Sequence, residues 1–138
     1  MSDVGEREKQ TQERVVRLFR DTLGYRYLGN WIDRDCNRNI ELELLRNWLK
    51  KRVYDGSLIS RAMHQLDKLA NDASKTLYER NRDVYEALRY GVKVKPDVSS
   101  STHTIWLVDW QHPENNDFAI AEEVTIPAKD SKGNTKRP

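Results

Sequence analysis

The spacing of apolar residues changes near residue 91, and this change limits the possible folds more than any other feature of the chain. Before it, apolar side chains recur every three or four positions, which is typical of amphipathic helices. After it, Val92 and Val94 alternate with lysines, and residues 104–110 form a nearly continuous apolar run, as strands do. Helices followed by strands predict an α+β fold.

Four helices are predicted before the change. The first occupies residues 1–24, and Gly24 is expected to cap its C-terminal end. Its apolar face contains Val15, Val16, Leu18, Phe19 and Leu23. The other three helices should form a helical subdomain over residues 40–90.

Within this subdomain one helix is predicted at about 40–53, a second after the N-cap Ser57, and a third at about 74–89. The apolar side chains that the third is expected to turn inward are Leu77, Tyr78, Val84, Tyr85 and Leu88.

Strands are predicted within residues 92–126. Residues 92–96 should form an edge strand that ends at Pro96. Residues 104–126 should form an antiparallel hairpin, because two apolar runs flank the turn residues 112–116.

Two further segments have weaker signals. The aromatic alternation of residues 25–31 fits either a short strand or an irregular arm, and residues 33–39 read as a polar loop. Residues 127–138 are predicted to be a polar tail.

Length and composition exclude several classes of protein. A chain of 138 residues fits one domain, and no apolar run approaches the length of a membrane span. The N-terminus lacks the apolar stretch of a signal peptide, so we expect a cytoplasmic protein with no membrane partner. Cys36, the single cysteine, excludes an internal disulfide and a CxxC metal motif.

The net charge of +2 conceals an uneven distribution. Residues 96–128 contain six acidic side chains and no Lys or Arg, whereas basic residues predominate over 73–95. The acidic block fits either a metal-dependent site that acts on phosphates or a solvated sheet face that discourages aggregation. The carboxylates that such a site would use are Asp109, Asp117, Glu122 and Glu123, although no D-x-D or H-E-x-x-H spacing accompanies them.

Basic residues on the predicted helices fit either contacts to a DNA backbone or solvated helix faces. The backbone candidates are Lys50, Lys51, Arg52, Arg80 and Arg82, from a larger set that includes Arg61, Lys75 and Arg89. The histidines His64, His103 and His112 are scattered and suggest no catalytic arrangement. The tryptophans Trp31, Trp48, Trp106 and Trp110 are expected in the core or at an interface.

Residues 12–30 resemble the opening of the R (restriction) subunit of type I restriction–modification enzymes. The likeness continues in order through residues 39–45, 88–92, 108–110 and 113–118. It implies the first part of a restriction-endonuclease-like α/β nuclease domain of the PD-(D/E)xK kind. For the full-length subunit it implies Mg²⁺, ATP-driven DNA translocation, and DNA, methylation and specificity subunits as partners.

The resemblance also indicates what the chain lacks. In this family the catalytic Asp and the Glu-x-Lys strand follow a segment like Lys136-Arg137-Pro138, so they would lie beyond residue 138. We therefore expect residues 1–138 to be an incomplete endonuclease domain that does not cleave DNA alone and is prone to self-association. Glu13 fits the family's first-helix glutamate near the metal, or equally a surface carboxylate. The alternative function is a non-catalytic α+β binding module for DNA or a protein partner.

Overall fold

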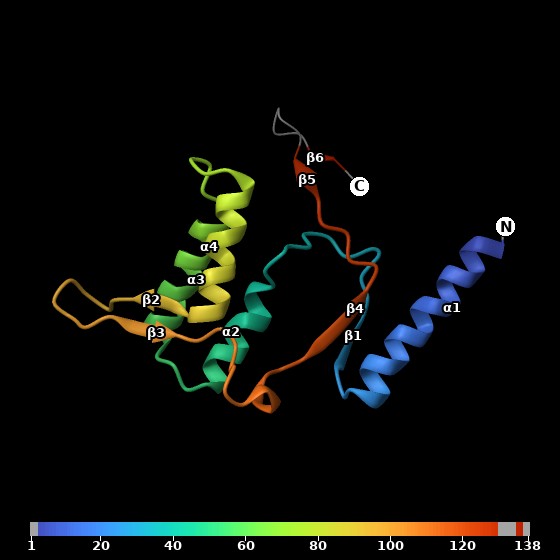
Figure 1. The fold of residues 1–138 in the computed structure, drawn as a ribbon, viewed down its shortest axis with the longest axis horizontal. Coiled ribbons are helices and arrows are strands. Elements are labelled where there is room, and N and C mark those ends of the chain that lie inside the picture. The colour runs from blue at the N-terminus through green and yellow to red at the C-terminus, as the bar shows by residue number, and fades with distance from the viewer. Residues whose placement is uncertain (1–2, 130–134, 137–138) are drawn as a thin grey trace. The chain divides into compact units, whose positions relative to one another are not determined.

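The computed structural model describes residues 3–129 and 135–136 and confirms the α+β class (Figure 1). Its helices are α1 (Asp3–Arg17), α2 (Leu42–Lys51), α3 (Gly56–Ala70) and α4 (Leu77–Tyr90), with a π-helical turn η1 (Leu18–Thr22) and a 3-10 turn η2 (Pro113–Asn115). Its strands are β1 (Arg26–Asn30), β2 (Val92–Val94), β3 (His103–Ile105), β4 (Ala119–Glu122), β5 (Ala128–Lys129) and β6 (Thr135–Lys136).

The chain forms two compact units. Unit 2 is continuous and spans Ile40–Asn116, whereas unit 1 combines the residues up to Asn39 with those from Asp117 onward. Unit 2 is therefore inserted between the two segments of unit 1. Length alone predicts one domain and does not reveal this insertion, because both junctions lie in polar segments without a distinctive composition.

Unit 2 contains the main hydrophobic core. Helix α3 packs against α2, α4 and β2, and β2 pairs with β3 in an antiparallel hairpin in which Val92 lies opposite Ile105 (Figure 1). The most deeply buried large side chains are Leu49, Ile59, Val92 and Ile105. The core therefore contains the apolar side chains of both the helices and the strands of unit 2.

The prediction of the inward face of α4 was mostly wrong. Leu77, Tyr78 and Tyr85 are more than 60% exposed, and Leu88 is 40% exposed. Only Val84 of the predicted set packs against the core, next to the buried Ala87. Helix α4 packs against α3 through the face that carries the small residue Ala87. The bulkier Tyr78 and Tyr85 lie on a neighbouring face, outside this contact.

Helix caps explain where α3 and α4 begin. The N-cap of α3 is Asp55, whose carboxylate accepts the backbone N–H of Ser57 at 3.1 Å, so the prediction of Ser57 as the cap was wrong. Thr76 and Glu79 form a capping box at the start of α4. Helix α2 ends at Lys51, and Val53, just beyond its C-cap Arg52, adopts φ 63° and turns the chain toward Tyr54.

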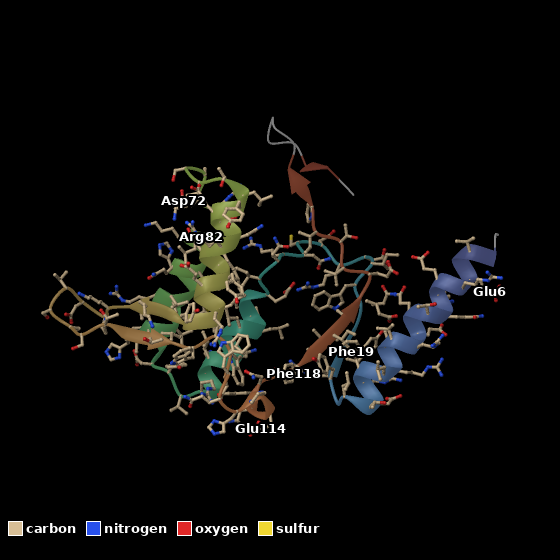
Figure 2. All side chains as sticks on the ribbon, viewed as in Figure 1. Glu6, Phe19, Asp72, Arg82, Glu114 and Phe118 are labelled. Atoms are coloured by element: carbon tan, nitrogen blue, oxygen red, sulfur yellow. The ribbon has the colours of Figure 1, made fainter. Side chains whose placement is uncertain are left out.

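Unit 1 contains a parallel strand pair. β1 lies beside β4, with Tyr27 opposite Ile120 and an irregularity before Gly29 (Figure 1). Three aromatic rings pack where the chain enters this strand pair. The Tyr25 ring meets the Phe19 ring edge-on, with 4.9 Å between the ring centroids, and stacks on the Phe118 ring, with 5.1 Å between the centroids. Phe19 and Phe118 are labelled in Figure 2. The aromatic segment 25–31 therefore contains a strand and not only an irregular arm.

The predicted antiparallel hairpin over 104–126 was wrong. β3 pairs with β2, and β4 pairs in parallel with β1, so the two predicted partners belong to different sheets. Parallel strands need a long crossover connection, and the whole of unit 2 supplies it. Apolar alternation identifies a strand but does not specify its partner, and this explains the error.

Residues 127–138 were predicted to be a polar tail. Within the described part of this stretch, β5 and β6 form a two-residue antiparallel pair, Ala128 opposite Lys136 and Lys129 opposite Thr135. None of the helices in the described part of the chain is both long and apolar enough to cross a membrane.

Candidate nucleic-acid interface

The side chain of Asp109 is held by hydrogen bonds within its own loop. Its carboxylate accepts the backbone N–H of His112 at 3.0 Å and the Asn115 side-chain amide at 3.2 Å. Arg52 forms an ion pair with it at 3.0 Å, and the aspartate is only 8% exposed. Asn116 closes the loop, because its amide accepts the Asp109 N–H and donates to the Asp109 carbonyl. Asp109 is therefore a structural anchor.

Three aromatic side chains attach the same segment to the helices of unit 2. The indole N–H of Trp48 donates to the Leu107 carbonyl at 3.0 Å, and that of Trp110 donates to the Leu88 carbonyl at 2.9 Å. The Tyr54 hydroxyl accepts the backbone N–H of Trp106 at 3.2 Å. The Trp106 N–H and the Leu107 carbonyl thus bond to side chains of α2 and the turn after it instead of to a strand partner, and β3 ends at Ile105.

Asp109 should make unit 2 sensitive to acid. The hydrogen bond from the His112 N–H, the Asn115 amide and the charge of Arg52 lower the pKa of Asp109 below its ordinary value of 3.8. A lowered folded-state pKa gives stability that is present above the unfolded-state pKa and is lost as the pH falls through the folded-state value. We predict that Asp109→Asn is less stable than the wild type at pH 7, and that the difference shrinks below pH 3.8.

Urea unfolding followed by tryptophan fluorescence at pH 7 and at about pH 3 measures this difference. Glu114→Gln is the control, because Glu114 lies exposed in the same loop (Figure 2). An Asp109→Asn deficit of equal size at both pH values would contradict the assigned role.

Two of the three remaining candidate carboxylates also have partners. Arg26 pairs with Asp117 at 2.9 Å, and Glu122 accepts hydrogen bonds from the Gln12 amide and the Tyr27 hydroxyl. The bond to Glu122 holds the Tyr27 hydroxyl in its neutral form and raises the pKa of Tyr27. Glu122 and Glu123 nevertheless line a hollow of about 520 Å³ in unit 1.

Glu13 lines this acidic hollow from α1. Glu8 also contributes from α1, while Glu122 and Glu123 contribute from the end of β4. Glu13 is exposed, so its carboxylate is accessible from solvent. The structure therefore gathers the one residue that the family resemblance singled out with two carboxylates of the acidic block.

The described residues do not form a complete Mg²⁺ site. In residues 3–129 and 135–136 no three His, Cys, Asp or Glu side chains lie close enough together to hold a metal ion. Hydrogen bonds and ion pairs within the fold engage three of the four candidate carboxylates of the acidic block, namely Asp109, Asp117 and Glu122.

The five predicted DNA-backbone residues differ in their availability. Lys50 and Lys51 are exposed in the last turn of α2. Arg52 is engaged by Asp109, and Arg82, labelled in Figure 2, lies 3.4 Å from Asp83, which also pairs with Lys75. Arg80 is half-buried on α4, and its Nε is enclosed without an acceptor in the described structure. The lysines of α2 are thus the most accessible of the five.

A second group of cations was only partly anticipated. A hollow of about 360 Å³ in unit 2 is lined by Arg61, Lys68, Lys93 and Lys95, together with His64 and Gln65. Arg61 was marked by its spacing on a predicted helix as a possible backbone contact, but the three lysines were not among the predicted residues. The spacing of these residues in the sequence could have indicated the group. Arg61 and Lys68 are seven positions apart on one helix, and Lys93 and Lys95 alternate with valines, so each pair lies on one face of its element.

The remaining predicted residues form no catalytic group. His103 and His112 are exposed on β3 and in the following loop, and Cys36 is a free, exposed thiol. Trp106 and Trp110 are 39% and 48% exposed, so only Trp48 of the three unit 2 tryptophans packs against the core. Trp31 is half-buried beneath the Arg34 guanidinium, which lies 3.9 Å from its ring.

Comparison with known proteins gives one match. The family model of the type I restriction enzyme R protein N terminus matches residues 5–138. No curated protein and no solved structure matches the chain.

Proposed function

Because the chain belongs to the family of type I restriction enzyme R protein N termini, we propose that it takes part in Mg²⁺-dependent cleavage of double-stranded DNA. Cleavage would follow ATP-driven translocation by other parts of the R subunit, while methylation and specificity subunits select the DNA sequence. The family match over residues 5–138 is the observation that supports this function most strongly.

In this proposal the chain contributes charge and position. Glu13 places a carboxylate on the wall of the acidic hollow of unit 1. Lys50 and Lys51 present exposed charges that can contact DNA phosphates from unit 2. We assign no step to the metal or to ATP, because the described residues do not assemble a site for the metal, and the sequence has no Walker-type loop for the nucleotide.

Glu13 gives this proposal a direct test. In an R protein that contains this chain, assembled with its methylation and specificity subunits, Glu13→Gln should slow plasmid cleavage at least about tenfold, because it removes a carboxylate charge at the cutting site. The rate of DNA-dependent ATP hydrolysis should stay unchanged, since translocation is assigned elsewhere. Both rates are measured in one reaction with supercoiled plasmid, ATP and Mg²⁺.

Glu6→Gln is the matched control, because Glu6 is exposed on the same helix but does not line the acidic hollow (Figure 2). Cleavage by the Glu13 variant at the wild-type rate would remove Glu13 from the active site. A complex that hydrolyses ATP but never cuts DNA, even with the wild-type chain, would refute the nuclease function itself.

A binding module remains the second candidate function. The lack of a metal-ligating group among the described residues favours it, since binding needs no such group. The two functions differ in the experiment above: a binding module predicts that Glu13→Gln leaves cleavage unchanged, whereas loss of DNA-binding cations weakens binding in either case.

A further inference from the structure

The hollow lined by Arg61, Lys68, Lys93 and Lys95, here called the cationic hollow, brings four cationic side chains of unit 2 around one space. No Asp or Glu belongs to its lining. Four positive charges around a space of about 360 Å³ repel one another, and this repulsion opposes folding unless an anion occupies or faces the site.

The core of unit 2 determines this arrangement. On α3 the buried residues Ile59, Ala62, Met63 and Leu66 occupy one face, which leaves the lining residues on another. The lining residues of α3 are Arg61, His64, Gln65 and Lys68, at the i, i+3, i+4 and i+7 spacing of one helical stripe.

The strand β2 supplies the other wall by alternation. Burial of Val92 and Val94 turns Lys93, and Lys95 just after the strand, to the outer face. Because α3 packs against β2, the helical stripe and the strand lysines share one hollow. The cations are therefore held on regular elements with a packed core beneath them.

Three of these residues form no ion pair in the described structure. Arg61, Lys68 and Lys95 have no carboxylate within salt-bridge distance, whereas Arg82 is paired with Asp83 and Arg52 with Asp109. Hydrogen bonds from Ser74 lower the pKa of Asp72, and Lys68 adds to this lowering only through longer-range charge attraction. Lys93 is oriented differently, because its ammonium donates to the Tyr90 carbonyl at 3.1 Å and to the Thr104 hydroxyl at 2.9 Å. The same ammonium lies 5.8 Å from the centroid of the Trp106 ring, so Lys93 contributes mainly its charge to the hollow.

We propose that the cationic hollow binds consecutive phosphates of a DNA duplex, an inference that rests on the proposed function. The lining contains no aromatic side chain on which bases could stack, which favours contact with the phosphate backbone over binding of a single strand. Four cations on two elements exceed what one small anion requires and match the repeated charges of a backbone.

The test compares two variants of the 138-residue chain that lose the same charge. The first combines Arg61→Gln, Lys68→Gln and Lys95→Gln, and the second combines Arg7→Gln, Arg14→Gln and Arg17→Gln on α1. All six residues are exposed, and Lys93 is left intact because it bonds to β3. Binding to a fluorescein-labelled 20-base-pair duplex is measured by anisotropy over a range of KCl concentrations, and circular dichroism confirms that both variants fold.

Loss of three phosphate contacts should weaken duplex binding on the order of 10²-fold at 0.1 M salt and reduce the salt slope of log K by about two to three. The α1 variant should retain the wild-type slope. Equal losses in both variants, wild-type binding by the cationic-hollow variant, or poly-L-glutamate binding as tight as duplex binding would each overturn the inference.

The two proposals fail separately. Absence of duplex binding by the wild-type chain, or an unchanged cationic-hollow variant, refutes the assigned contact while leaving plasmid cleavage by the assembled R protein to be measured independently. Failure of the assembled R protein to cleave plasmid, with duplex binding by the chain intact, would contradict the nuclease function and leave the role of the cationic hollow standing.

Discussion

Gly91→Ala should lower the free energy of unfolding of unit 2 by about 2–5 kcal/mol, which is the sum of a backbone term and a steric term. Gly91 joins α4 to β2 with φ 81° and ψ 165°, a conformation that is essentially restricted to glycine. A Cβ atom built there lies 2.5 Å from Thr104 Cγ2 and 3.2 Å from the Ile105 carbonyl oxygen. Urea unfolding followed by tryptophan fluorescence measures the loss.

Thr104→Ser separates the two terms of this prediction. Serine lacks the Cγ2 methyl but retains the hydroxyl that accepts a hydrogen bond from the Lys93 ammonium. The double variant Gly91→Ala/Thr104→Ser should therefore recover the part of the steric term that is due to Thr104, and leave the backbone term and the contact with the Ile105 carbonyl. Gly56→Ala is the control, since Gly56 has an ordinary φ and open space around its Cβ position. A Gly91→Ala loss no larger than that of the control would contradict the conformational argument.

Leu49→Ala should destabilise unit 2 by about 2–5 kcal/mol, the usual range for truncation of a buried leucine. Leu49 is fully buried on α2 and belongs to the cluster that also contains Ile59 and Ile105. The cavity left by the substitution lies where α2 meets α3, so the packing of these two helices should weaken together. A Trp31→Phe background restricts the fluorescence signal to the tryptophans of unit 2.

Leu77→Ala provides the comparison, because Leu77 is 66% exposed at the start of α4. Its expected effect is within about 0.5 kcal/mol, as for most surface substitutions. Leu49→Met keeps most of the volume and should cost less than about 1.5 kcal/mol. Similar losses for Leu49→Ala and Leu77→Ala would show that unit 2 lacks the packed core described above.

Local signals in the sequence predicted the helices well but not all of their faces. The periodicity before residue 91 located α1 to α4 within a few residues, because amphipathic spacing and turn residues act over short distances. The inward face of α4 was misassigned, since Tyr78 and Tyr85 share a stripe that helical spacing marks as apolar. Which face of α4 is buried depends on the helix that packs against it, and the buried face is the one that carries Ala87.

The sequence named both Glu13 and Asp109 as candidate site residues, but the role of Asp109 was not predicted. The family resemblance selected Glu13, and the structure adds that it lines a hollow with Glu122 and Glu123. Asp109 was one of four carboxylates of a block that fitted either a metal-dependent site or a solvated sheet face. Its actual role depends on Asn115 and Asn116, whose side chains bond back to it within the same loop. Turn-forming asparagines shortly after an aspartate are a signal that could have indicated this structure.

The sequence by itself determined the α+β class, the positions of the helices, the outward lysines of β2 and the likeness to the R protein family that the family model confirms. Only the tertiary structure decided that β4 pairs with β1 across the inserted unit 2, and that α3 and β2 join their cations in one hollow. The physical reason is that side-chain periodicity records which face of an element is buried. It does not record which distant element covers that face.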